Sequence, residues 1–193
     1  HSGGRLMALV IKGSSSGQVT LDVPAAAGTN TITIPATSGT MLDTNSVIDK
    51  SKLPSGTIVQ MIHASTTSQT GTTAGSFTAT NCAAQITPRV AANKIIVMAS
   101  SSVYISAANQ QASATIYRDS TNLSASSTRG IVQFWGNSAV VQGDCSIMLT
   151  DHPNTTNAVT YALYIRKLAA GGGQVFAGVD STTQFITLLE VQV

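Results

Sequence analysis

The feature that most constrains the fold is a succession of short apolar stretches separated by turn residues, which runs from Thr57 to the end of the chain. The stretches are "TIVQMIHA", "GSFTATNCAAQITP", "KIIVMASSSVYIS", "SATIYRD", "GIVQFWG", "CSIMLTD", "AVTYALYIRKL", "GQVFAG" and "FITLLEVQV". Strands with turn signals about every ten residues are typical of a β-sandwich or barrel. No stretch has the pattern of an amphipathic helix, so the sequence predicts an all-β fold.

The N-terminal part carries shorter strand patterns of the same kind. "ALVIKG", "QVTLDVP", "TITIP" and "TML" are separated by "GSSSG", "AAAGTN" and "ATSGT". Pro24 and Pro35 close two of them, as suits exposed strand ends. Strands this short cannot build a core in one chain, but three chains wrapped together could bury one face of each.

These patterns divide the chain into four parts. Residues 1–6, before Met7, are expected to be a remnant of cloning. Residues 7–45 are predicted to form a β stem or virion anchor. Residues 46–56, with a local concentration of charge and then proline and glycine, are predicted to form a neck. Residues 57–193 are predicted to form a β-sandwich knob.

Charge is scarce in this sequence. Charged residues make up 9% of the chain, against roughly 25% in ordinary soluble proteins, and the mean hydropathy is +0.20. Such a surface predicts an obligate homo-oligomer. The net charge of +2 includes no basic run, so nucleic acid is not an expected partner. No apolar run approaches the length of a membrane span, so membrane insertion is not expected.

The sequence carries no motif that predicts catalysis, a metal or a cofactor. Cys82 and Cys145 are expected to be small buried side chains, because neither belongs to a C-x-x-C pair. His63 and His152 lack neighbouring ligands at zinc spacing. "GSSSG" matches the nucleophile-elbow pattern, but a strand pattern follows it where the elbow needs a helix. We therefore expect no enzymatic activity.

Phe134 and Trp135 are consecutive aromatic residues on a predicted strand. Neighbouring strand residues point to opposite faces, so only one of the two can lie in the core. The other reaches solvent, packs against a neighbouring subunit or contacts a ligand.

Several phrases give the chain a family resemblance. "GQVTLDVPAAAGTNTITIPATSGTML" resembles a segment of structural proteins from marine and freshwater tailed phages, including cyanophage-like ones. "LPSGTIVQM", "ITPRVAANKIIVMAS", "IYRDSTNL", "DHPNTTNAVTYALYIR" and "ITLLEV" are similar to phrases of the C-terminal knob on phage tail fibres and capsid fibres. That knob is a jelly-roll-like sandwich similar in outline to the trimeric TNF and C1q folds.

The resemblance implies a homotrimer that is part of a virion and is assembled in the bacterial host cytoplasm. Its N-terminal part would attach to the capsid or tail, and its knob would adhere to a host-surface glycan. The alternative is a capsid decoration or cement protein with a purely structural role. A depolymerising enzyme would need clustered carboxylates or a long β-helix, for which the chain is too short.

Two sets of residues are candidates for these roles. Amides and an aromatic on predicted loops suit sugar hydroxyls. The ligand candidates are Gln110, Gln111, Trp135, Asn137 and Asn154. The candidates for structural or trimer contacts are Arg118, Asp119, Asp151, Arg166 and Glu190. Among the latter, Asp119 is expected to cap backbone donors, Arg118 to pair with a nearby acid, and Glu190 to meet Arg166 or a water near the trimer axis.

Overall fold

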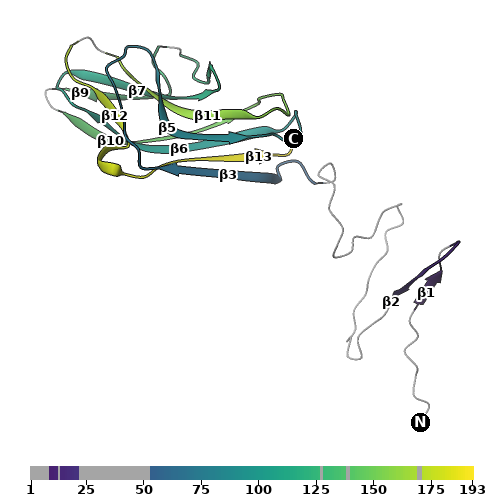
Figure 1. Cartoon of the computed structure of the whole chain (residues 1–193). Helices are drawn as coiled ribbons and strands as arrows, with labels where there is room; N and C mark the ends of the chain where they lie inside the picture. The colour runs from purple at the N-terminus through teal and green to yellow at the C-terminus, as the bar shows by residue number, and fades with distance from the viewer. Residues whose placement is uncertain (1–8, 13, 22–52, 127, 138–139, 169–170) are drawn as a thin grey trace. The chain divides into compact units, whose positions relative to one another are not determined.

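The computed structural model describes residues 9–12, 14–21, 53–126, 128–137, 140–168 and 171–193 (Figure 1). The chain divides into two compact units, residues 1–47 and 48–193, and each is described by itself. The division falls within 46–56, and the roles predicted for stem and neck stay predictions. Among the residues described, no helix is long and apolar enough to cross a membrane.

In the first unit, two of the predicted N-terminal strands are described. β1 (Leu9–Lys12) and β2 (Gln18–Leu21) pair in an antiparallel ladder. Their connection ends at Gly17, whose φ of 78° is a left-handed conformation that glycine adopts without steric cost. Residues 14–17 of the "GSSSG" segment thus belong to a turn between strands, as predicted. The strands predicted at 31–35 and 40–42 lie outside the described residues.

The regular elements described in the second unit are strands apart from one 3-10 turn, so the all-β prediction is confirmed. The longer strands are β3 (Ile58–Thr66), β5 (Thr78–Ile86), β6 (Lys94–Ile105), β7 (Gln110–Arg118), β9 (Val132–Gly136), β10 (Val141–Asp151), β11 (Val159–Lys167) and β13 (Gln184–Val191). The shorter elements are β4 (Thr70–Thr72), β8 (Thr121–Asn122), β12 (Val175–Ala177) and the 3-10 turn η2 (Val179–Ser181). Every predicted knob strand is present, whereas β4 and β8 were not predicted.

The pairing of the longer strands is that of a jelly roll. The first strand pairs with the last, β3 with β13, and the series continues inward with β5 and β11, β6 and β10, and β7 and β9. Together these four pairs form one long antiparallel hairpin, with β3 and β13 at its open end and β7 and β9 at its closed end. It is rolled up so that β13 also pairs with β6, and β11 with β7. Two antiparallel sheets result, β3–β13–β6–β10 and β5–β11–β7–β9, stacked as in Figure 1.

The core between the sheets is made of small and branched side chains. Inward positions alternate with outward ones along β5 and β11, as the pleat requires. Tyr161 is the largest of the fully buried side chains. Cys82 and Cys145 are buried free thiols, and burial raises their pKa to about 11 and about 12, with a contribution from Cys82 to the shift of Cys145. Both cysteines therefore pack as neutral apolar groups, as predicted.

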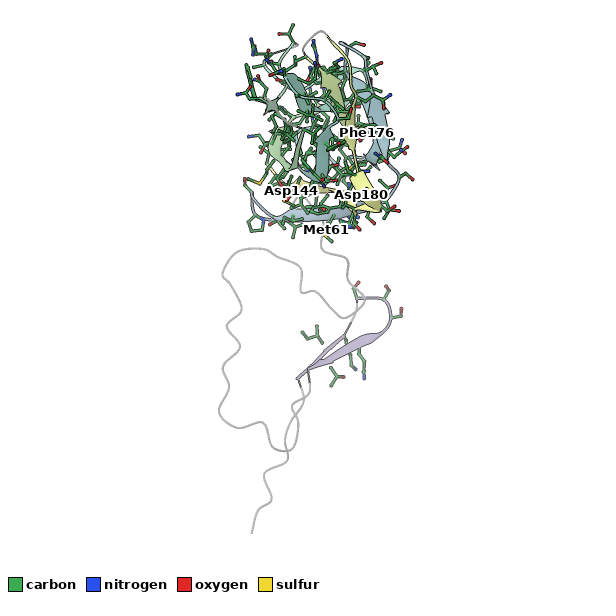
Figure 2. All side chains as sticks on the ribbon, turned by 90° about the vertical axis from the view of Figure 1, so that its left-hand side faces the viewer. Met61, Asp144, Phe176 and Asp180 are labelled. Atoms are coloured by element: carbon green, nitrogen blue, oxygen red, sulfur yellow. The ribbon has the colours of Figure 1, made fainter. Side chains whose placement is uncertain are left out.

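The sandwich has two distinct ends. At the entry end, Gly56 N–H donates to the Gln192 carbonyl over 2.8 Å, and Gln192 N–H donates to the Thr57 carbonyl over 2.9 Å. The preceding chain therefore joins β3 beside the end of β13. β6 runs from this end to the opposite, free end, a length of on the order of 35 Å for its 12 residues. Figure 2 looks onto the free end.

Candidate functional site

The outer face of the β3–β13–β6–β10 sheet carries a band of apolar side chains. The register aligns Met61, Leu189 and Ile96 in one row across the sheet. The next row contains Met98 beside Met148. In the third row, Phe185 lies opposite Ser65 and Ser100. We call Met61, Ile96, Met98, Met148, Phe185 and Leu189 the apolar face.

Much of this band is open to solvent in the single chain. Met148 is 74% exposed, Met61 64% and Phe185 39%. Figure 2 shows Met61 on the outside of the sandwich. Exposed apolar patches of this kind usually mark an interaction surface, and methionine side chains adapt to irregular partners.

Charge is confined to the borders of the apolar face. The three rows also hold His63, Thr187, Ser146 and Thr150, and none of their side chains is Lys, Arg, Asp or Glu. Lys94, opposite Val191, borders the entry end. Asp144, opposite Ser102, borders the free end. Asp144 lies in the same lower part of the sandwich as Met61 in Figure 2.

His63 lies within this band and contacts two of its neighbours there. Its Nδ1 is 2.9 Å from the Thr187 hydroxyl, and its ring lies 6.1 Å from that of Phe185. Among the residues described, no three His, Cys, Asp or Glu side chains group as a metal site would require.

The predicted ligand residues separate between the two ends of the sandwich. Gln110 and Gln111 begin β7 at the free end, where they lie opposite Gly136 and Trp135. Asn137 follows β9 there and is exposed. Asn154 lies at the entry end, in the turn after β10, with a left-handed φ of 51°. The structure therefore brings four of the five candidates to the free end and leaves Asn154 away from them.

These four do not all face the same surface. Gln110 is 7% exposed, whereas Trp135 is 54% exposed. Trp135 and the half-buried Gln111 lie on the outer face of the β5–β11–β7–β9 sheet, while Phe134 packs against the core. The pair Phe134 and Trp135 thus divides between core and solvent, as strand alternation requires.

Two further polar side chains extend this region, one on the strand of Trp135 and one in the loop before it. Gln133 is two residues earlier on the same strand and is exposed, so it shares the face of Trp135. Its Oε1 accepts a hydrogen bond from Arg129 Nη1 over 3.2 Å. We call Gln111, Arg129, Gln133 and Trp135 the distal patch. Gln133 follows from alternation in the sequence, but the position of Arg129 depends on a loop that the sequence does not fix.

That loop is held against β7 by backbone contacts. Ser113 Oγ donates to the carbonyl of Arg129, and Ile131 N–H donates to the carbonyl of Ala114 over 2.8 Å. Gly130 has a φ of 66°, and a Cβ there would lie 2.6 Å from the Ala114 carbonyl oxygen. Only glycine allows this approach, and the loop so held carries Arg129, whose side chain contacts Gln133.

The partners of Glu190 differ from the Arg166 pairing predicted from the sequence. Glu190 is fully buried, and its Oε1 accepts from Asn93 Nδ2 over 2.7 Å and from Arg89 N–H over 2.8 Å. Its Oε2 accepts from Gln60 Nε2 over 2.6 Å. Arg166 lies on the outer side of the other sheet, with its guanidinium 5.4 Å from the centre of the Phe77 ring. The predicted pairing of Glu190 with Arg166 is wrong, because alternation turns Glu190 inward and Arg166 outward.

The other structural candidates form local contacts at the entry end. Arg118 Nη1 lies 2.6 Å from Asp151 Oδ2, which also accepts from the Tyr161 hydroxyl over 2.7 Å. Burial, and then the hydrogen bond to Asp151, raise the pKa of Tyr161 far above its ordinary value, so the hydroxyl remains a donor. Asp119, at φ 51°, accepts from Thr160 N–H over 2.9 Å. Arg118 thus pairs with an acid and Asp119 caps a backbone donor, as expected.

Comparison with known proteins gives matches among solved structures. No family model matches the chain, and no curated protein matches it. Among solved structures, the chain is similar to the D431N mutant VP2 protein of infectious bursal disease virus in derived T=1 particles, with 14% identity and a TM-score of 0.38. The match covers 94% of this chain and 44% of that chain. The jelly-roll assignment rests on the strand pairing of this chain itself.

Proposed function

We propose that the protein is a homotrimeric structural component of a bacteriophage virion, a fibre-like protein whose knob adheres to a host-surface glycan. The observation that carries the proposal is the apolar face, a charge-free band on an otherwise complete sandwich. A second copy of the chain is the partner that this face fits, because an always-exposed methionine and phenylalanine band would favour aggregation. The phage assignment rests on the sequence resemblance, and jelly rolls are used by both viral capsid proteins and lectins.

The apolar face is smaller than a stable interface, which supports a role for the N-terminal part in assembly. Strand spacing of about 4.8 Å and row spacing of about 7 Å give the band an area of roughly 400 Å². A stable interface buries about 800 Å² per partner. We therefore assign the remaining contact to residues 7–45, which would intertwine between chains and attach the trimer to the capsid or tail.

The molar mass in solution tests the assembly. We expect three times the 19.8 kDa of one chain by light scattering. Met148→Lys places a charge in the apolar face at a side chain that is 74% exposed, so it should lower the mass without unfolding the sandwich. Gln85→Lys, at an exposed position on the other sheet, is the matched control and should remain trimeric. A monomeric wild-type chain at micromolar concentration would refute the proposal.

Location on the virion distinguishes the two roles. Labelled antibody against the knob should mark tail or fibre positions under the electron microscope. Uniform labelling of the capsid surface would instead favour the decoration or cement protein.

A further inference from the structure

The distal patch has the composition of a binding surface. Trp135 is the only tryptophan of the chain, and it is 54% exposed, although large aromatic side chains are normally buried when the fold allows it. Gln111 lies opposite it on β7, and Gln133 lies beside it on β9. The indole therefore has an amide side chain on each of two sides.

The patch is also held in place. Both glutamines and Trp135 belong to paired strands. The Arg129 loop is fixed by Ser113 and by the close approach of Gly130 to β7. A site on fixed elements loses little conformational entropy when a ligand binds.

The distal patch contains a positively charged side chain and no negatively charged one. Among the described residues from Gln110 to Asn137, Asp119 has the only acidic side chain. It lies at the other end of β7, where it accepts a hydrogen bond from Thr160 N–H. Arg129 is the charge within the patch itself. A guanidinium in this setting favours a carboxylate or another planar anion.

We propose that the distal patch binds an acidic saccharide, with the sugar ring on the indole and the sugar carboxylate on Arg129. The apolar face of a pyranose stacks on an aromatic ring, and the amides of Gln111 and Gln133 offer both donors and acceptors to ring hydroxyls. This inference rests on the proposed function, since it names the glycan that the knob would bind. It also leaves the apolar face free for assembly, because the patch lies on the other sheet.

Tryptophan fluorescence of the full chain tests the inference directly, since Trp135 is the sole indole. The probes are trigalacturonic acid and the neutral α-1,4-galactotriose, which share ring stereochemistry and linkage and differ in the carboxylates. We expect the acidic trisaccharide to change the emission in a saturable way that high salt weakens. An equal response to the neutral trisaccharide, or no saturable response to the acidic one, would overturn the inference.

Variants separate the two contacts. Arg129→Gln should weaken binding of the acidic probe roughly tenfold, while Arg89→Gln, which removes an exposed charge at the entry end, should leave it unchanged. Trp135→Ala should abolish heat of binding in calorimetry. If Arg129→Gln and Arg89→Gln behave alike, the assignment to Arg129 is wrong. The molar mass is measured on every sample, so that loss of the trimer, which would contradict the proposed function, is distinguished from loss of binding.

Discussion

Replacing Glu190 with glutamine should destabilise the sandwich more than any other isosteric exchange of an acidic side chain in the described residues. The carboxylate is fully buried and receives four donors: Gln60 Nε2, Asn93 Nδ2, and the N–H groups of Arg89 and Val90. Together these bonds fasten β13 to β3 and to the loop before β6 at the entry end.

The size of the stability loss follows from which hydrogen bonds the glutamine amide keeps and which it loses. Its oxygen can retain the contacts of Oε1 at the strength of neutral hydrogen bonds, each about 1 kcal/mol weaker than a charge-assisted one. Its NH₂ group would face Gln60 Nε2, which also donates to the Thr87 carbonyl over 2.8 Å, so two donors would oppose each other. Relief of the cost of burying a charge offsets part of this loss. We expect a net destabilisation of about 3 kcal/mol.

Thermal unfolding followed by far-ultraviolet circular dichroism measures this loss. For a domain of this size, about 3 °C per kcal/mol gives a fall in Tm of roughly 9 °C. Asp180→Asn, which removes an exposed carboxylate, is the matched control and should melt like the wild type at equal concentration. A Glu190→Gln protein that melts together with this control would refute the account of Glu190 as a fully used acceptor.

Three further predictions concern the sandwich. Gly130→Ala should cost about 2 kcal/mol in urea unfolding and shift the Trp135 emission, because a Cβ there would lie 2.5 Å from Ser113 Oγ; unchanged emission would contradict the role of this glycine. The pKa values of Cys82 and Cys145 rise on folding from 9.0 to about 11 and about 12. Their contribution to stability is therefore full below pH 9 and is lost as pH rises through the folded values, so a Cys82→Ala/Cys145→Ala protein should show a smaller alkaline loss of stability in urea titrations than the wild type. Tyr161→Phe removes the hydroxyl from Asp151 and should cost about 1 kcal/mol by the same measurement, whereas Tyr104→Phe, on the outer face of β6, should be neutral.

The architecture could be predicted from the sequence because strands are recognised by their alternation of apolar and polar residues and by the turn residues between them. Each predicted knob strand exists, and the turn after Tyr117 contains Asp119 as a backbone acceptor. The short strands β4 and β8 were missed because their few residues have no period of their own. Glu190 was misplaced because its partners come from β3 and from a loop far away in sequence, and only the rolled hairpin brings them to it.

The candidate ligand residues show where residue type alone stops being informative. Gln111 and Trp135 were grouped by chemistry, and the register of β7 and β9 places them opposite each other. Asn154 has the same chemistry but follows β10 at the entry end. Arg129 was not predicted, since its position depends on Gly130 and on a hydroxyl of β7 rather than on any local pattern.

One strand of the sandwich lacks the usual alternation of apolar and polar residues, and this is the strongest sequence signal for the proposed assembly. β11 reads "VTYALYIRK", with inward Val, Tyr, Leu and Ile alternating with other side chains. β6 begins "KIIVMA", where Ile96 and Met98 on the outer face are as apolar as Ile95 and Val97 in the core. Strands that are apolar on both faces are normally covered on both. In the single chain nothing described covers the outer one, so the sequence of β6 supports the proposed partner on this face.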